Sequence, residues 1–321
     1  MPPDAIVWDI PLDSTVPDIG VVLQARLGHR EQEIVVLDAV SPHLRLVSSD
    51  RSVRGSLPSG EGPAEVTDPI AVAVWQDTAV VASGNLELKI VDLRDGAVAT
   101  FASGRRAVLG LARGCGSDLM EYAPERMPDS AGGWSYLSQV VRVGDSTVHQ
   151  RLLLDDGPRD QLVAKGRPSG IVGAGNSVLI RHDFGKPRVL RSRCSSEGAV
   201  ELAELWELDH GMPRVSIPRE GGRPHLVGDH LLLPAGIAQL GQDTVVLASF
   251  RLSDRKGGQG STRFEILTTG SRAHVDVVGH WILRDSAADG RILLERTGAA
   301  PRLFIVRAPE LTRALLALVP I

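Results

Sequence analysis

Short apolar runs separated by turn residues recur along the whole chain, and this pattern restricts the fold more than any other feature. The runs are rich in Val, Ile and Leu, and Asp-Gly, Ser-Gly, Gly-Asn or Pro lies between them. Such runs are typical of β-strands rather than amphipathic helices. The 34 glycines and 20 prolines of the 321-residue chain favour the same interpretation, because many short strands need many turns. The clearest runs span residues 33–37, 43–47, 70–75, 78–82, 86–91 and 97–101.

These strands recur as a unit. In its fullest form, residues 75–82, 84–92 and 95–101 are three strands joined by short turns. The third unit is the weakest, because the run at 118–122 is short and a loop rich in Pro and Gly follows it. Six units result, at a spacing of roughly 40–65 residues. Their second strands are expected to begin near residues 33, 78, 118, 177, 244 and 290.

Each unit is a β-meander that cannot bury both of its faces alone. Units stacked around a ring bury these faces and leave only short edges. We therefore predict an all-β, six-bladed β-propeller of four-stranded antiparallel blades, with residues 1–321 as a single domain. The last unit ends after its third strand, near Val306, so we expect residues 5–11 to supply the missing outer strand and close the ring. A short helix is expected at 309–319, with Pro309 and Glu310 at its start.

One stretch also matches known blade motifs. Gly60-Glu61-Gly62-Pro63-Ala64-Glu65-Val66 follows the turn pattern G-x-G-P-G-E-F except at Ala64 and Val66. Asp38, Asn85 and Asp92 match the pattern V-V-D-x-x-N-x-R-I-x-x-F-D, whereas Ala82 and Val91 depart from it. Residues 34–101 thus resemble the extracytoplasmic six-bladed propellers related to NHL-repeat proteins. The resemblance implies the fold and says little about chemistry, because propellers host many functions.

Some propellers of this kind are membrane-extrinsic subunits of larger complexes, including photosynthetic reaction-centre assemblies, so the resemblance implies such a role. Most members of the family are exported. The N-terminus here lacks the basic and apolar regions of a signal peptide. Two expectations therefore stay open: the protein stays in the cytoplasm, or a leader is removed and the protein acts in the periplasm. In either compartment it is expected as a peripheral membrane protein.

Charge and cysteine content exclude several classes of protein. A formal net charge of −4 does not favour binding to nucleic acid. No run of about 18 apolar residues is present to span a membrane. Cys115 and Cys194 have neither the CxxC nor the His spacing of a zinc site, so we expect two free thiols or one disulfide.

Catalytic and metal-binding residues are not indicated. Calcium needs about six oxygen ligands. The candidate calcium ligands at strand starts are better explained as turn residues that bind their own backbone. A histidine that acts as a general base for a serine nucleophile needs a motif such as G-x-S-x-G, and the sequence has none. The segment 257–261 lacks the Lys of a phosphate-binding loop. We therefore predict no catalytic residue, no cofactor and no metal. The candidates weighed are Glu33, Asn85, Asp118, Asn176 and Asp243 for calcium, and His149, His182 with Asp183, His210, His225, His230 and His280 for acid–base work.

Three features are candidate partner-binding elements. A basic cluster spans two neighbouring strands and serves either as a charged blade edge or as a docking patch for an acidic partner. The tail beyond 309 carries apolar residues on one helical face, which pack on the propeller itself or on a partner. Trp134 is expected in a loop, as an interface anchor or a plug of the disc. The residues selected are Arg181, Lys186, Arg188, Arg191, Arg193, Trp134, Leu315 and Leu318.

Together these features predict a non-enzymatic binding or scaffolding module that serves a larger protein complex, with other protein subunits as partners. The alternatives are a channel-centred, metal-dependent hydrolase of the lactonase type and a small-ligand sensor.

Overall fold

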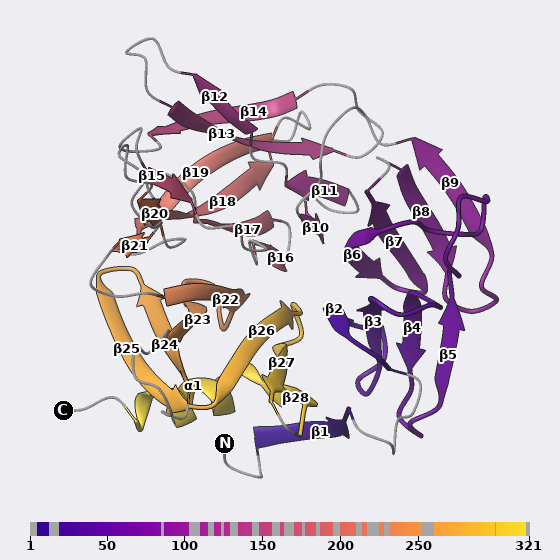
Figure 1. Cartoon of the computed structure of the whole chain (residues 1–321). Helices are drawn as coiled ribbons and strands as arrows, with labels where there is room; N and C mark the ends of the chain where they lie inside the picture. Colours follow the sequence, from indigo (N-terminus) through magenta and orange to yellow (C-terminus); the bar gives the residue numbers. More distant parts are fainter. Residues whose placement is uncertain are drawn as a thin grey trace.

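The computed structural model contains seven antiparallel β-sheets and one helix within the residues that it describes. Figure 1 shows the sheets side by side around a common centre. Side chains are not described for most strand residues between 120 and 163, nor for residues 214–216 and 225–227. The structure describes residues 5–12, 19–84, 87–102, 110–114, 119–122, 125–128, 134–142, 148–155, 161–163, 170–174, 177–183, 187–194, 200–209, 214–216, 225–227, 232–251, 260–298 and 300–318.

Five of the sheets are four-stranded blades. Four of them are continuous meanders in which each strand pairs with the next one along the chain. These are β2 (Val22–Leu27), β3 (Ile34–Asp38), β4 (Leu44–Val47) and β5 (Val53–Ser56); β6 (Pro69–Trp75), β7 (Thr78–Ser83), β8 (Glu87–Asp92) and β9 (Val98–Ala102); β16 (Ile171–Ala174), β17 (Ser177–His182), β18 (Arg188–Cys194) and β19 (Val200–Glu207); and β22 (Leu232–Gln239), β23 (Val245–Arg251), β24 (Ser261–Thr268) and β25 (Ser271–Val278).

The fifth blade joins the two ends of the described chain. It consists of β26 (His280–Ser286), β27 (Arg291–Thr297), β28 (Arg302–Arg307) and, at its outer edge, β1 (Ile6–Pro11). β1 pairs antiparallel with β28, with Ile10 opposite Leu303. The leading residues therefore close the ring as the sequence predicts, and their apolar side chains cover an edge that would otherwise be exposed.

The prediction of six such blades is wrong, because the structure shows five. The weak third unit forms a five-stranded sheet, in which the first four strands have the order β10-β11-β13-β12 and β14 also pairs with β13. β12 lies within the expected loop and pairs with β13, so this sheet is not a four-stranded meander. β10 still contacts β6 and β16, and the ring continues through it. Its strands are β10 (Gly110–Arg113), β11 (Leu119–Tyr122), β12 (Glu125–Pro128), β13 (Trp134–Arg142) and β14 (Val148–Asp155).

The remaining sheet and the helix come from the connecting segments and the tail. The small sheet has the order β15-β20-β21, formed by β15 (Gln161–Val163), β20 (Arg214–Ser216) and β21 (His225–Val227). The helix α1 (Ala308–Leu316) follows β28 directly and has a Pro in its first turn. Within the described part of the chain, no helix has the length and apolar character needed to cross a membrane.

Small aliphatic side chains fill the space between the blades. Only 4% of the residues are aromatic, so Val, Ile, Leu and Ala supply most of the core. Val35, Val81 and Val91, all fully buried, pack between the first two blades. The last two blades share a cluster that includes Val246 and Ile292. The first strands of six sheets, β2, β6, β10, β16, β22 and β26, face the centre of the ring.

Candidate functional site

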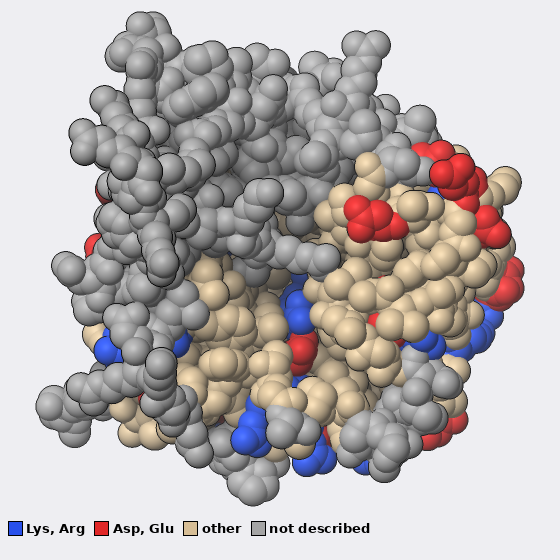
Figure 2. Space-filling model, viewed as in Figure 1, with Lys and Arg blue, Asp and Glu red and all other residues tan. Residues whose placement is uncertain are grey.

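Two cavities lie end to end along the centre of the ring. The beginnings of β2, β6 and β26 line the first, of about 420 Å³, which we call the channel mouth. The ends of the same strands line the second, of about 560 Å³. Arg26, in β2, lines both cavities and therefore lies at the boundary between them. Figure 2 shows a hollow near the centre of the face in view, with basic and acidic atoms at its floor.

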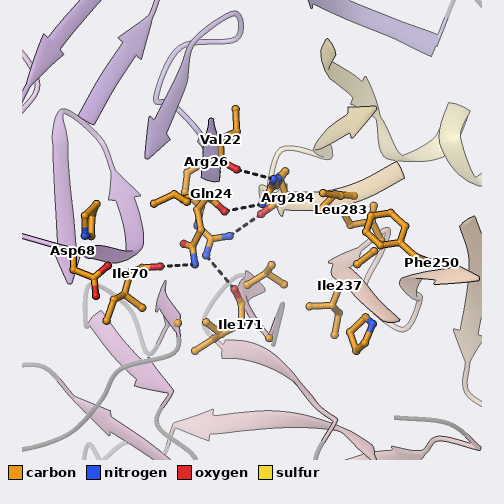
Figure 3. Close-up of a pocket in the computed structure, with 18 residues that line it drawn as sticks. Val22, Gln24, Arg26, Asp68, Ile70, Ile171, Ile237, Phe250, Leu283 and Arg284 are labelled. Carbon is orange, nitrogen blue, oxygen red and sulfur yellow. Dashed lines mark hydrogen bonds between the residues drawn. The ribbon is translucent and has the colours of Figure 1, made fainter. Parts of the chain in front are cut away.

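Arg26 is bonded to the backbone of four other sheets. Its Nε donates to the carbonyl of Val72 at 2.9 Å, and its Nη1 donates to the carbonyl of Arg284 at 2.7 Å. Its Nη2 donates to the carbonyls of Leu111 and Ile171 at 3.2 and 3.4 Å. These carbonyls belong to β6, β26, β10 and β16, so one side chain connects five of the strands around the centre. Figure 3 shows the guanidinium at this crossing point.

The charge of Arg26 is balanced by Asp285. Its Nη1 lies 3.7 Å from Oδ1 of Asp285, and the side chains are 9% and 14% exposed. Oδ2 of Asp285 accepts the backbone N–H of Leu27 at 2.9 Å. Burial raises the pKa of Asp285 and lowers the pKa of Arg26, because desolvation disfavours both charged forms more than their attraction favours them.

Gln24 and Arg284, which also line the channel mouth, are bonded within the protein, and Asp68 adds a carboxylate to the lining. The amide of Gln24 donates to the carbonyl of Ile70 and accepts the N–H of Val72. Arg284 donates to Glu295 at 2.6 Å and to the carbonyl of Leu23 at 2.9 Å. The remaining surface is largely apolar. Figure 3 shows Ile237 and Phe250 from one side of the ring across from Ile70. Such a site fits apolar groups of a ligand or partner.

Arg181 is not a surface residue, which corrects the prediction that it belongs to a docking patch. Its side chain is fully buried, and Nε donates to Asp183 at 2.7 Å. Nη1 donates to the carbonyl of Ala248 at 2.6 Å, and Nη2 donates to Oγ of Ser249 at 2.9 Å. The side chain joins β17 to β23 of the next blade, so it is not available to contact another protein.

The rest of the basic cluster is partly engaged within the protein, by carboxylates of its own blade and by a carbonyl of the next one. Arg188 pairs with Glu204 and, at 3.9 Å, with Glu207, and Arg191 donates to the carbonyl of Gln242 at 3.2 Å. Arg193 lies opposite Glu201 in the register of β18 and β19. Its side chain and the whole of Lys186 lie outside the described residues.

The structure shows one of the two arrangements expected for the tail and places Trp134 in a strand rather than a loop. α1 packs on the propeller itself, where Leu315 is 4% exposed within the core of the last two blades. Leu318, just beyond the helix, is 57% exposed and stays available. Trp134 begins β13 rather than lying in a loop, opposite Pro128 of β12, and its side chain is outside the described part.

The metal-ligand and histidine candidates do not form a described site. Glu33 is buried and accepts the N–H of His29, whereas Asp243 is exposed between β22 and β23. No three of the described His, Cys, Asp and Glu residues lie together as a metal ion would need. Of the histidines, His182 is buried beside the Arg181 pair and His280 is exposed at the start of β26. Asn85, Asp118, Asn176, His210, His230, Cys115 and residues 257–259 of the glycine-rich segment lie outside the described residues, as do the side chains of His149, His225 and Cys194.

Sequence reasoning missed Arg26 and Gln24. Both interrupt the otherwise apolar run 22–27, and a polar residue in a strand expected to be buried was the available signal. The run alone does not show that these side chains point to the centre of a ring, where carbonyls of other sheets are within reach.

Sheets arranged around a central axis, closed by the first strand, define the chain as a β-propeller. Solved structures with the same fold include an exported-protein candidate from Bacteroides fragilis, with 8% identity over 94% of both chains and a TM-score of 0.54. The structure of U3-55K is 12% identical over 93% of this chain and 98% of its own, with a TM-score of 0.51. A luciferin-regenerating enzyme is 11% identical over 94% and 95%, with a TM-score of 0.50. No protein-family model and no curated protein matches the sequence.

Proposed function

We propose that the protein is an interaction module, acting as one domain, that binds another protein through the face bearing the channel mouth. The observation that carries this proposal is the chemistry of the mouth. Gln24, Arg26 and Arg284 are engaged with the protein's own backbone and carboxylates, Asp68 adds one carboxylate, and most of the other lining residues are apolar. At such a surface, the burial of a partner's apolar side chains contributes most of the favourable binding free energy.

Exposed aliphatic residues extend this surface over the rim. Val21 is 59% exposed and Val40 is 51% exposed. They belong to neighbouring segments, since the N–H of Ala39 donates to the carbonyl of Val21 at 2.9 Å. Val21 immediately precedes Val22 and Leu23, which line the mouth. The mouth and the rim therefore form adjoining apolar surfaces that a partner can cover together.

Arginine side chains that join neighbouring blades support a rigid platform. Arg26 and Arg181 connect their strands to other sheets across the ring or the blade interface. Arg291 donates from β27 to the carbonyls of Gly28 and Arg30 beside the first blade. A surface that is already ordered loses little conformational entropy when it binds.

The tail and the basic strand are secondary candidates. Leu316 and Leu318 expose apolar side chains at the end of α1, and Arg191 is partly exposed on β18, the third strand of its blade. The candidate contact residues are Leu318, Lys186, Arg188, Arg191, Arg193 and Trp134. Arg181 and Leu315 are not among them, because both side chains are buried. The narrower proposal of a membrane-extrinsic subunit in a photosynthetic complex rests on the resemblance of residues 34–101 alone, in either compartment.

Site-specific photo-crosslinking in cells tests the proposal. A benzophenone amino acid replaces Val21 on the rim, and in a matched control it replaces Ala288, which is exposed at the opposite cavity. We expect a defined cross-linked polypeptide from position 21 and none from position 288. Equal products from both positions, or no product from position 21 together with elution as a free monomer from native lysate, would overturn it.

A further inference from the structure

A serine and a histidine are hydrogen-bonded at a cavity between the first two blades. Oγ of Ser59 lies 2.7 Å from Nε2 of His43, and Nδ1 of His43 lies 2.9 Å from the carbonyl oxygen of Asp38. His43 is 6% exposed and immediately precedes β4, whereas Ser59 is exposed in the segment between β5 and β6. Neither residue lines the channel mouth, although the cavity beside them shares Leu23, Asp68 and Pro69 with it, and the interaction role above does not use the pair.

The contact with Asp38 determines which ring nitrogen of a neutral His43 carries the proton. A carbonyl oxygen only accepts hydrogen bonds, so Nδ1 must be the donor. In the neutral ring Nε2 then has a free lone pair, and the hydroxyl of Ser59 donates to it. A hydroxyl that donates to an oriented imidazole is the arrangement that activates serine nucleophiles.

The group that orients His43 is itself held firmly. The carboxylate of Asp38 accepts the N–H groups of Gly20, Val21 and Val40 at 2.7 to 2.9 Å, and Nε of Arg45 at 2.9 Å. The N–H of Asp38 donates to the carbonyl of His43 at 2.7 Å. The turn between β3 and β4, which carries His43, is therefore held by hydrogen bonds at Asp38 and at His43.

The backbone around Ser59 has unusual dihedral angles. Leu57 has φ of 59° although its side chain is buried, and Gly60 has φ of 150°. Non-glycine residues with positive φ are uncommon and concentrate at functional sites. The N–H of Gly60 makes a bond of 3.3 Å to the carbonyl of Val66, which is long for a backbone hydrogen bond. The N–H that follows the nucleophile is one of the oxyanion donors in serine hydrolases.

A cavity of about 370 Å³ adjoins the pair. Leu23, Val66 and Pro69 form apolar walls, and Asp68 contributes a carboxylate that disfavours anionic ligands. The cavity is at the small end of the usual range for ligand pockets, so it suits a small neutral molecule.

We propose that Ser59 is a nucleophile activated by His43, with reactivity toward small neutral carboxylic esters. Oγ of Ser59 forms a bond to the carbonyl carbon, and its proton passes to Nε2 of His43. The ester C–O bond then breaks, and His43 returns the proton to the leaving alcohol. Water attacks the acyl-serine with the same proton transfers and releases the carboxylic acid and the free serine. The N–H of Gly60 exchanges its long bond to the carbonyl of Val66 for a bond to the oxyanion.

The test uses the purified full chain, a fluorophosphonate probe and p-nitrophenyl acetate. Phosphonylation releases fluoride and leaves one adduct, which peptide mass spectrometry locates. We expect the adduct on Ser59, and a loss of labelling rate and ester turnover of about 100-fold or more in Ser59→Ala and His43→Asn. Asn at position 43 keeps a donor for the Asp38 carbonyl but provides no base. Ser52→Ala, an exposed serine in the same blade, is the matched control and keeps the full rate.

Labelling of the unaltered chain no faster than Ser59→Ala, an adduct on another residue, or full labelling of a folded His43→Asn would each overturn the proposal. If His43→Asn lowers the melting temperature, the exposed Ser59 variant decides the question alone. Because Ser59→Ala leaves Val21 intact, the cross-link at position 21 persists in this variant, and the two proposals fail independently.

Discussion

The Nε atom of Arg26 donates to the backbone carbonyl of Val72, 2.9 Å away in the neighbouring blade, at the centre of the ring. The same guanidinium reaches carbonyls of three further sheets and pairs with Asp285. These bonds compensate the cost of burying the guanidinium, and removal of one partner would leave a buried group without compensation.

Replacement of Arg26 should destabilise the protein strongly. Arg26→Met leaves the carbonyls of Val72 and Leu111 without their donor and leaves Asp285 buried without its counter-charge. We expect the free energy of unfolding to fall by about 3–5 kcal/mol, measured by urea denaturation. Arg94→Met, which removes an exposed pair with Asp92, is the control and should leave the midpoint unchanged. A similar midpoint for both variants would contradict the structural role of Arg26.

Arg181 should behave as a structural residue rather than a docking residue. Arg181→Met removes its bonds to Asp183 and to the carbonyl of Ala248. The expected loss is about 3–5 kcal/mol in urea denaturation, because the Asp183 carboxylate stays buried. Addition of Asp183→Asn should restore part of that loss by removing the buried charge. A loss below about 1 kcal/mol for the single variant would place the side chain at the surface instead.

The two leucines of the tail should differ sharply. Leu315→Asp puts a carboxylate into the core of the last two blades, so we expect a loss of at least about 2–5 kcal/mol in the free energy of unfolding, the range for truncating a buried leucine. Leu318→Asp alters an exposed position and should stay within about 0.5 kcal/mol of the unaltered protein. Thermal melts followed by circular dichroism measure both, and an unaffected Leu315→Asp would show that α1 does not pack on the propeller.

Asp276 should contribute stability that acid removes. The hydrogen bonds from Arg263 hold the pKa of this carboxyl below its usual value. A lowered folded pKa stabilises the protein above the unfolded pKa of about 3.9, and the contribution is lost as pH falls through the folded pKa. Asp276→Asn should therefore lower the free energy of unfolding at pH 7 by at most about 1 kcal/mol, because the pair is partly exposed. The difference in free energy of unfolding between Asp276→Asn and the unaltered protein should shrink below pH 4 in urea titrations. A difference that grows there would show that the pKa of Asp276 is raised rather than lowered in the folded protein.

Closure of the ring should depend on β1. Ile10 is fully buried and lies opposite Leu303. Ile10→Ala should cost about 2–5 kcal/mol by urea denaturation, because a cavity opens in the last blade. Asp9→Ala, which removes a half-exposed pair with Arg302, is the adjacent control and should cost less than about 1 kcal/mol. Equal effects at the two positions would mean that the edge of β28 is not sealed by this strand.

Local pattern was sufficient to place the strands. The expected second strands begin within about one residue of β3, β7, β11, β17, β23 and β27, because a strand is set by a short apolar run between turn residues. The shape of the third sheet was not predictable in this way. β12 is a short polar segment, and only its pairing with β13 makes it a strand.

The sequence by itself determined where the strands lie, whereas the tertiary structure decided which side chains meet. Periodicity determined the class of the fold and the strand positions, because these depend on residues close together along the chain. The closing role of residues 5–11 followed from the missing fourth strand of the last unit, and β1 fills it by pairing with β28 at the far end of the chain. The burial of Arg181, the central place of Arg26 and the meeting of Ser59 with His43 required the tertiary structure. Each depends on groups from another strand or blade, and the stacking of blades, rather than local pattern, sets which groups meet.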